Sequence, residues 1–202
     1  MTIRKGEEWG RVGSVPSGCV PATDEAELHR LLNAGPLPRA IGLLGGDLGR
    51  TVSASADRER LTEGSSAVLA TIDLAEVHHD HGRHRVAAHA VLRRSWWWGP
   101  VLVIANAQFI GDWDVAPRSH PNDGWLDVTE VDRRMSVGQR LAARRRLPLG
   151  AHTPHPLIST SRLREGEWEF ARAVPLWLDG VRVGSTRTLR VRVLPDALPV
   201  CF

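Results

Sequence analysis

The sequence lacks most of the features that identify common classes of enzyme. It holds two cysteines, Cys19 and Cys201, which stand far apart and outside any Cys-x-x-Cys pattern, so neither a disulfide framework nor a zinc site is indicated. The motifs Gly-x-Ser-x-Gly, His-Glu-x-x-His and Gly-x-Gly-x-x-Gly are missing, and so is a Walker A loop. The residues alone therefore name no reaction.

No apolar run is long enough to cross a membrane as a helix. The longest, at residues 100–111, is interrupted by Asn106 and Gln108, whereas a spanning helix needs about 20 apolar residues. Residues 1–8 are charged from the start and lack the apolar core of a signal peptide. We therefore expect a cytoplasmic protein without a transmembrane segment.

Net charge is also small. The 202 residues carry a formal charge of +3, and tyrosine is absent although there are eight tryptophans. The basic residues are scattered over most of the chain and no motif for reading DNA or RNA is present, so we expect no nucleic-acid partner. An apolar fraction of 42% fits a folded globular chain and excludes a disordered one.

The pattern of expected elements changes near residue 64. Before that point, short strands are expected at residues 18–20 and 40–44, and they should be parallel because a helix separates them. That helix begins after Asp24, which can cap it while Glu27 reaches back to form a capping box. This pattern indicates a small α/β unit.

Beyond that point the apolar pattern shortens to a period of two, which is typical of strands. Strands are expected at residues 71–77, 85–96, 101–110, 125–131, 157–163, 167–170, 176–178, 181–183 and 188–194. One helix interrupts them at residues 137–147, where Ser136 and Gln139 form a second capping box. The fold class is therefore α/β plus all-β: a unit at residues 1–63, then a sandwich or barrel at residues 64–202 with one inserted helix.

Gly45, Gly46 and Asp47 stand where an expected strand passes into a helix at residues 48–55. Small residues at such a turn let backbone N–H groups approach an anion, and a helix N-terminus favours negative charge. A nucleotide phosphate needs this geometry. An ordinary tight turn with Asp47 as the helix cap explains the same residues, so both interpretations stand.

Asp179-Gly180 lies between two alternating apolar runs, which is the strongest short signal for a β-hairpin. The functional alternative is that Asp179 acts as a general base at the tip of that hairpin. The residues themselves favour the turn.

Asp123 belongs to a second expected turn, Pro-Asn-Asp-Gly at residues 121–124. With Asp112, Asp114 and Asp127 it makes a local acidic group that could hold Mg²⁺ through oxygen ligands. Solvated carboxylates beside a turn are the commoner case.

Two further clusters have both a functional and an ordinary explanation. A metal site or a polar loop tip explains the histidines of one expected turn: His78, His79, His81 and His84. Docking on anionic lipid headgroups or a solvated basic face explains the arginines of the inserted helix: Arg140, Arg144, Arg145 and Arg146.

Four segments, taken in order, resemble the diacylglycerol kinase and sphingosine kinase-like lipid kinases, including the bacterial YegS type. Residues 43–51 (LLGGDLGRT) resemble the family's P-x-G-T-G-N-D-x-A-R segment. Residues 103–117 resemble its V-x-N-G strand and the loop that ends in Ala-Pro. Residues 121–128 (PNDGWLDV) resemble x-D-D-G-x-L-D-V, and residues 177–180 (WLDG) fall where the family has Q-x-D-G-E.

The resemblance implies a nucleotide-binding α/β domain, a C-terminal β-sandwich, and Mg²⁺-dependent transfer of the γ-phosphoryl group of ATP to a lipid hydroxyl. It assigns Gly45, Gly46 and Asp47 to the nucleotide, Asp123 to Mg²⁺ and Asp179 to the base that deprotonates the acceptor. It also implies a lipid or other small-molecule ligand and allows peripheral membrane contact. A second copy or a partner chain could complete the site.

The sequence departs from the family in its phosphate-handling half. The family's Gly-Gly-Asp-Gly-Thr cradle is replaced by residues 21–27, which have three carboxylates and no glycine. Val181 replaces the Glu after Asp-Gly, and Asp112-Trp113 replace a Gly-Gly pair. The α/β unit is thus read as truncated, and ATP turnover is expected to be impaired or lost. Two hypotheses follow: a kinase-like phosphotransferase with an unusual donor site, or a non-catalytic pseudokinase that binds a lipid, nucleotide or protein partner.

Overall fold

The computed structural model describes residues 9–202, so the charged stretch at residues 1–8 lies outside the described residues. The helices are α1 (Glu25–Asn33), α2 (Gly46–Thr51) and α3 (Val137–Arg146), with the 3₁₀ turns η1 (Arg58–Leu61) and η2 (Leu147–Leu149). The strands are β1 (Arg11–Ser14), β2 (Cys19–Ala22), β3 (Ala40–Leu43), β4 (Ser66–His79), β5 (Gly82–Val86), β6 (His89–Arg93), β7 (Val101–Ala105), β8 (Phe109–Ile110), β9 (Trp113–Asp114), β10 (Leu126–Val131), β11 (Ile158–Leu163), β12 (Glu165–Leu178) and β13 (Val181–Cys201).

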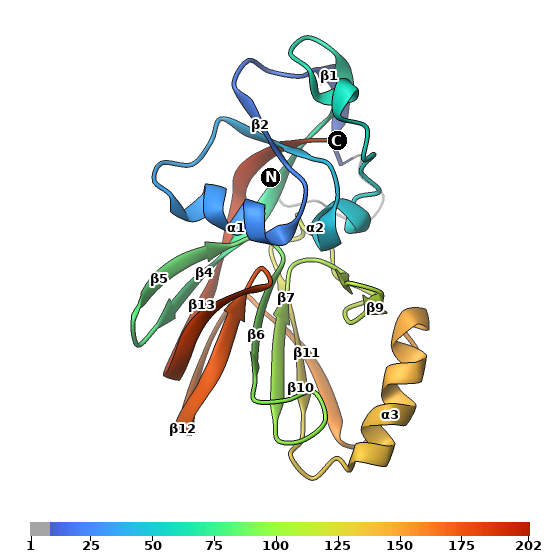
Figure 1. The fold of residues 1–202 in the computed structure, drawn as a ribbon, viewed down its shortest axis with the longest axis vertical. Helices are drawn as coiled ribbons and strands as arrows, with labels where there is room; N and C mark the ends of the chain where they lie inside the picture. Colours follow the sequence, from blue (N-terminus) through green and yellow to red (C-terminus); the bar gives the residue numbers. More distant parts are fainter. Residues whose placement is uncertain (1–8) are drawn as a thin grey trace.

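Eleven strands form one sheet, in the order β1-β4-β13-β12-β6-β7-β10-β11 with β2, β3 and β5 attached beside this path. All its pairs are antiparallel except β2 with β3 and β3 with β13. The long strands β4 and β13 run from the part that carries α1 and α2 into the part opposite, beside which α3 lies (Figure 1). The result is a mostly antiparallel sheet with few helices, as in a β-sandwich.

Two apolar clusters hold this arrangement together. One lies inside the bent sheet and includes the fully buried Leu92, Leu126 and Leu176. The other joins α1 and α2 to the sheet through Leu28 and Leu48, which are also fully buried. Each such leucine stabilises the fold by about 2 kcal/mol relative to an exposed position.

The helix signals and the parallel pair are confirmed with one change. Asp24 accepts a hydrogen bond from the N–H of Glu27 at 2.8 Å, and β2 and β3 are parallel. The carboxylate of Glu27 returns to the N–H of Thr23 at 3.0 Å rather than to Asp24, so the expected capping box is shifted by one residue. The second capping box, at Ser136 and Gln139, is present as expected.

The expected helix at residues 48–55 is wrong in its bounds and in its cap. The helix is Gly46–Thr51, Gly45 takes the position before it, and no side chain caps it. The chain turns out of the helix at Ser53, whose φ of 58° no helix residue adopts. Asp47 lies inside the first turn and bonds elsewhere.

The expected strand at residues 85–96 is divided into β5 and β6. Between them, the N–H groups of Ala87 and Ala88 bond to the carboxylate of Asp179 instead of to a neighbouring strand. The expected strand at residues 101–110 is likewise divided, into β7 and β8. Here the side chain of Asn106 donates to the carbonyl groups of Asp73 and Ala87.

The four short strands expected after residue 166 join in pairs into β12 and β13. One sheet therefore runs across the expected boundary at residue 64, because β4 pairs with β1 and β13 pairs with β3. The division into units at residues 1–63 and 64–202 stays a prediction. Within residues 9–202 there is no helix of the length and apolar character needed to cross a bilayer.

Candidate functional site

Asp179 lies in the turn between β12 and β13, with a φ of 45° and a side chain that solvent does not reach. One carboxylate oxygen accepts from the N–H of Ala88 at 2.8 Å and of His89 at 3.1 Å, and the other from the N–H of Ala87 at 3.1 Å. Nδ1 of His29 lies 3.7 Å away. The carboxylate thus fastens β5 and β6 to the hairpin, which leaves little acceptor capacity for a substrate proton.

Asp47 joins α2 to the turn after β8. Its Oδ1 accepts from the N–H of Gly111 at 2.6 Å, and its Oδ2 lies 3.9 Å from Nδ1 of His89. Burial raises the pKa of Asp47 above its ordinary value, and burial lowers the pKa of the fully enclosed His89. Arg50 donates to the carbonyl of Gly111 at 2.7 Å, so α2 binds both backbone polar groups of Gly111.

His89 is the residue that sequence reasoning missed. It lies between the expected nucleotide residue Asp47 and the expected base Asp179, which both act on its pKa through their charge. Its backbone N–H bonds to Asp179, and its ring contacts the carbonyl of Ala107 at 3.3 Å. The sequence offered only a histidine near other histidines, so no local signal linked it to two carboxylates 42 and 90 positions away.

Glu25, the first residue of α1, lies against the start of α2. Its Oε1 accepts from the N–H of Leu48 at 3.0 Å, and a Cβ atom on Gly46 would overlap its carboxylate. Burial is the main reason that the pKa of Glu25 is raised to about 7. The place that the sequence assigns to a nucleotide phosphate is therefore filled by a carboxyl group of the same chain, and the residues there do not fit ATP.

Asp123 makes its contacts elsewhere, with none of Glu25, Asp47 and Asp179 among its hydrogen-bond partners. Its Oδ1 accepts from the N–H of Trp125 at 3.0 Å, and its Oδ2 pairs with the guanidinium of Arg162. The same guanidinium lies 3.4 Å from Asp127. Since Arg162 stands between the two carboxylates, and residues 9–202 contain no cluster of three or more potential metal ligands, this arrangement does not fit Mg²⁺.

The histidines expected in the β4–β5 turn do not converge on one point: His79 and His84 stack with His29 of α1, while His78 bonds to Glu76. The ring of His84 lies 5.3 Å from that of His29 and 5.2 Å from that of His79, with the planes nearly parallel. Burial lowers the pKa of His79 and of His84, which favours neutral rings. The stack packs α1 against β4 and β5.

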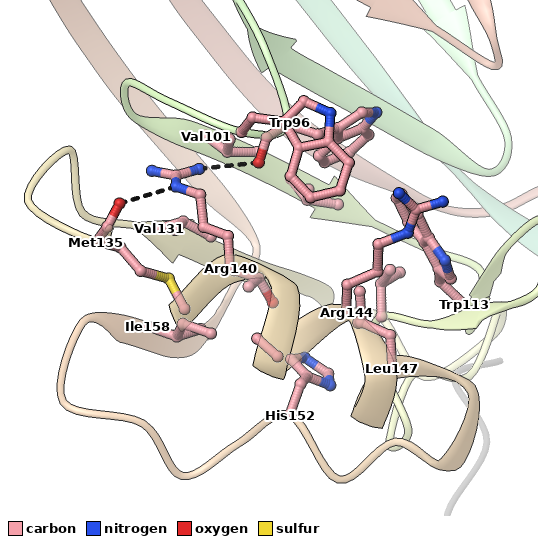
Figure 2. A pocket seen from close by; sticks show the side chains of 15 residues that line it. Trp96, Val101, Trp113, Val131, Met135, Arg140, Arg144, Leu147, His152 and Ile158 are labelled. Atoms are coloured by element: carbon pink, nitrogen blue, oxygen red, sulfur yellow. Dashed lines mark hydrogen bonds between the residues drawn. The ribbon is translucent and has the colours of Figure 1, made fainter. Parts of the chain in front are cut away.

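A cavity of about 90 Å³ lies between α3 and the outer face of β7 and β10 (Figure 2). Its walls are mostly apolar and include Trp96, Val103, Trp113, Val131 and Leu147. Walls of this kind favour an apolar occupant over water.

Arg140 fixes α3 over this cavity. Its side chain is buried and donates only to backbone carbonyl groups, those of Met135, Trp96, Gly99 and Asp132. These bonds attach the β6–β7 loop to the helix. The guanidinium of Arg140 is thus hydrogen-bonded within the protein and is not available to a ligand.

Arg144 differs from Arg140 because its guanidinium remains available. It lies over the rings of Trp97 and Trp113, at 5.0 Å and 5.3 Å from their centroids, and it forms no salt bridge in the part of the chain that is described. Figure 2 shows it beside Trp113 at one side of the cavity. An apolar cavity with an unpaired cation at its edge suits an amphiphile with an anionic head and an apolar tail.

The fold is that of a β-sandwich protein with few helices. The sequence profile described as "YegS C-terminal NAD kinase beta sandwich-like domain" matches residues 48–202, and the chain belongs to this YegS-type family. No curated protein is similar enough in sequence to count as a relative.

The fold is similar to solved structures from Bacillus anthracis str. Sterne. A candidate diacylglycerol kinase aligns with a TM-score of 0.69 at 9% identity, covering 92% of this chain and 78% of that one. A structure described as a diacylglycerol kinase gives 0.65 at 9% identity, with 92% and 76% covered. Another candidate diacylglycerol kinase gives 0.68 at 10% identity, with 92% and 78% covered. At such identities the likeness establishes the fold alone.

Proposed function

We propose that this protein is a lipid-binding member of the YegS-type family that does not transfer phosphate. The observation that carries the proposal is the apolar cavity beneath α3 with the unpaired guanidinium of Arg144 at its edge. The ligand class is an anionic amphiphile, whose head would pair with Arg144 while the end of its alkyl chain enters the cavity.

The second part of the proposal rests on the region that the family resemblance assigns to ATP and Mg²⁺. Phosphoryl transfer depends on positioned phosphate and metal contacts. Here Glu25 fills the start of α2 against Gly46, and Arg162 lies between Asp123 and Asp127. The truncated α/β unit is thus proposed to support the sandwich rather than to present a nucleotide. The alternative, a phosphotransferase with an unusual donor site, is supported by no contact among residues 9–202.

Binding can be measured with dodecyl phosphate, an anionic amphiphile, kept below its micelle concentration and followed by tryptophan fluorescence. Arg144→Gln removes the charge at the cavity edge and should weaken binding roughly tenfold or more, since a hydrogen bond to a charged group contributes about 1.5–3 kcal/mol. Arg145→Gln is the matched control, because it removes one charge from the same helix at an exposed position and should leave binding unchanged.

A third variant tests the tail. Ala143 lines the cavity, so Ala143→Leu should fill part of it and weaken binding even though Arg144 is intact. The melting temperature of each variant shows whether it is folded. Equal effects of Arg144→Gln and Arg145→Gln, or wild-type protein that does not respond to dodecyl phosphate, would contradict the proposal.

A further inference from the structure

The face of α3 that points away from the sheet exposes apolar side chains. Val137 and Leu141 stand one helical turn apart and are 56% and 41% exposed, and Leu149 in the following turn is 81% exposed. Exposed large apolar residues are unremarkable when single. Here three of the five exposed large hydrophobic residues found within residues 9–202 fall in 13 consecutive positions.

The same segment carries a strong charge of one sign. Residues 133–149 contain six arginines and no carboxylate. Arg140 is buried and Arg134 pairs with Asp132 at 2.8 Å, so the exposed cations without a salt bridge to a described residue are Arg133, Arg144, Arg145 and Arg146. The first turn of α3 holds no acidic residue, where helices ordinarily favour one. The arrangement therefore leaves cations around an exposed apolar stripe.

A fourth apolar side chain lies beside this segment. Trp98 is 63% exposed in the loop between β6 and β7, and Arg140 of α3 bonds to the carbonyl groups of Trp96 and Gly99 on either side of it. The loop is thus tied to the helix. Tryptophan favours the boundary between water and the apolar part of a bilayer.

We propose that the outer face of α3, together with the Trp98 loop, docks the protein on the surface of an anionic bilayer. Arginines draw the surface to acidic headgroups while Val137, Leu141 and Trp98 enter the boundary with the acyl chains. A nucleic-acid surface would satisfy the arginines but would leave these apolar side chains without a partner, so the charge and the apolar stripe together favour the bilayer. None of the side chains proposed to meet the bilayer (Val137, Leu141, Trp98, Arg145 and Arg146) lines the cavity, so the proposal stands independently of the proposed ligand.

The test is cosedimentation with extruded vesicles. Vesicles of phosphatidylglycerol and phosphatidylcholine in equal parts should bind the protein at low salt, pure phosphatidylcholine vesicles should bind it far less, and binding should fall steeply as salt is raised. Arg145→Glu with Arg146→Glu should weaken binding at least roughly tenfold, because each basic residue near such a surface contributes about fivefold. Arg58→Glu with Arg60→Glu, on η1, makes the same change of charge elsewhere and should bind like the wild type.

The apolar part needs its own variant. The double variant Val137→Gln with Leu141→Gln leaves every charge in place, and glutamine is a good helix former, so α3 should persist. This variant should lower the binding to vesicles that remains at high salt. Equal loss from both arginine pairs would mean attraction by net charge alone and would overturn the assignment of the surface. So would binding of an oligonucleotide in preference to vesicles through Arg145 and Arg146. Dodecyl phosphate binding, measured on the same variants, shows separately whether the cavity is intact.

Discussion

Three carboxyl groups, those of the buried Asp73 and Asp179 and of the half-buried Glu25, accept hydrogen bonds from backbone N–H groups distant in sequence. Asp73, for example, accepts from Gly124 at 2.7 Å and from Asp196 at 2.8 Å. At these positions a backbone N–H group donates to a carboxylate instead of to a carbonyl group of a neighbouring strand or to a helix-capping side chain. Their removal should therefore affect the stability of the fold.

Asp179→Asn separates this structural role from a catalytic one. Asparagine tolerates the left-handed backbone of residue 179 as well as aspartate does, so only the carboxylate is changed. The amide keeps one acceptor oxygen and places a donor near an N–H group of Ala87 or Ala88, which should lower the free energy of unfolding by about 3 kcal/mol. Urea unfolding measures this.

The control for that variant is Asp112→Asn, in a turn where the side chain is 99% exposed and lies 3.8 Å from Arg50. Its stability should be nearly that of the wild type, because exposed ion pairs contribute little. If Asp179→Asn were as stable as Asp112→Asn, the carboxylate would not be a structural anchor, and its role as the expected base would regain support.

Glu25 gives a prediction on pH. Its pKa is raised from 4.5 to about 7, mainly by burial, so the folded protein holds this proton more tightly than the unfolded chain. Stability from Glu25 is then fully present below pH 4.5 and is lost as pH rises toward 7. Glu25→Gln keeps the acceptor for Leu48 but cannot ionise.

As the pH rises from about 4.5 to 8, the free energy of unfolding of Glu25→Gln should therefore increase relative to that of the wild type. The gain is at most about 3 kcal/mol, and less where the partly hydrated carboxyl is screened. Denaturant unfolding at several pH values measures both proteins. A difference that does not change with pH would show that the carboxyl is not desolvated.

At the scale of elements, the sequence predicts what depends on neighbours along the chain. The cap of α1 at Asp24 and the capping box of α3 at Ser136 are local, and both are present. The gap between β5 and β6 is not local, since it exists because Asp179 takes the N–H groups of Ala87 and Ala88. No periodicity of residues 85–96 could reveal a partner about 90 positions away.

In the candidate site, too, the features set by neighbouring residues could be predicted and those set by distant residues could not. The turn at Asp179 and the glycines at the start of α2, Gly45 and Gly46, could be found from sequence, because turn chemistry is local. What fills the space beside Gly46 could not, because Glu25 arrives from another helix. The cavity beneath α3 was invisible for a similar reason: its walls come from β7, β10 and the β6–β7 loop as well as the helix.

On the scale of the whole molecule, the part that carries α1 and α2 and the part beside α3 differ in whether their polar groups already have partners (Figure 1). Where α1 meets α2, Glu25 and Asp47 accept hydrogen bonds from backbone N–H groups of the same chain, at the place that the family resemblance assigns to a nucleotide. Beside α3, Arg144 lies at the edge of the apolar cavity and forms no salt bridge with a described residue. The family's sandwich is thus combined with a helical part in which Glu25 and Asp47 accept hydrogen bonds from backbone N–H groups of the same chain.

This contrast gives a prediction for the intact protein with ATP and Mg²⁺. A ligand at 100 times its Kd adds about 2.7 kcal/mol, which for a domain of this size raises the melting temperature by roughly 5–10 °C. We expect no such rise at millimolar ATP with Mg²⁺, because Glu25 lies against Gly46, where the family resemblance expects a phosphate, and would have to leave its bond to Leu48. Magnesium sulfate at equal ionic strength is the control. A rise that needs both ATP and Mg²⁺ would mean that Glu25 moves aside, and the phosphotransferase hypothesis would then replace the binding one.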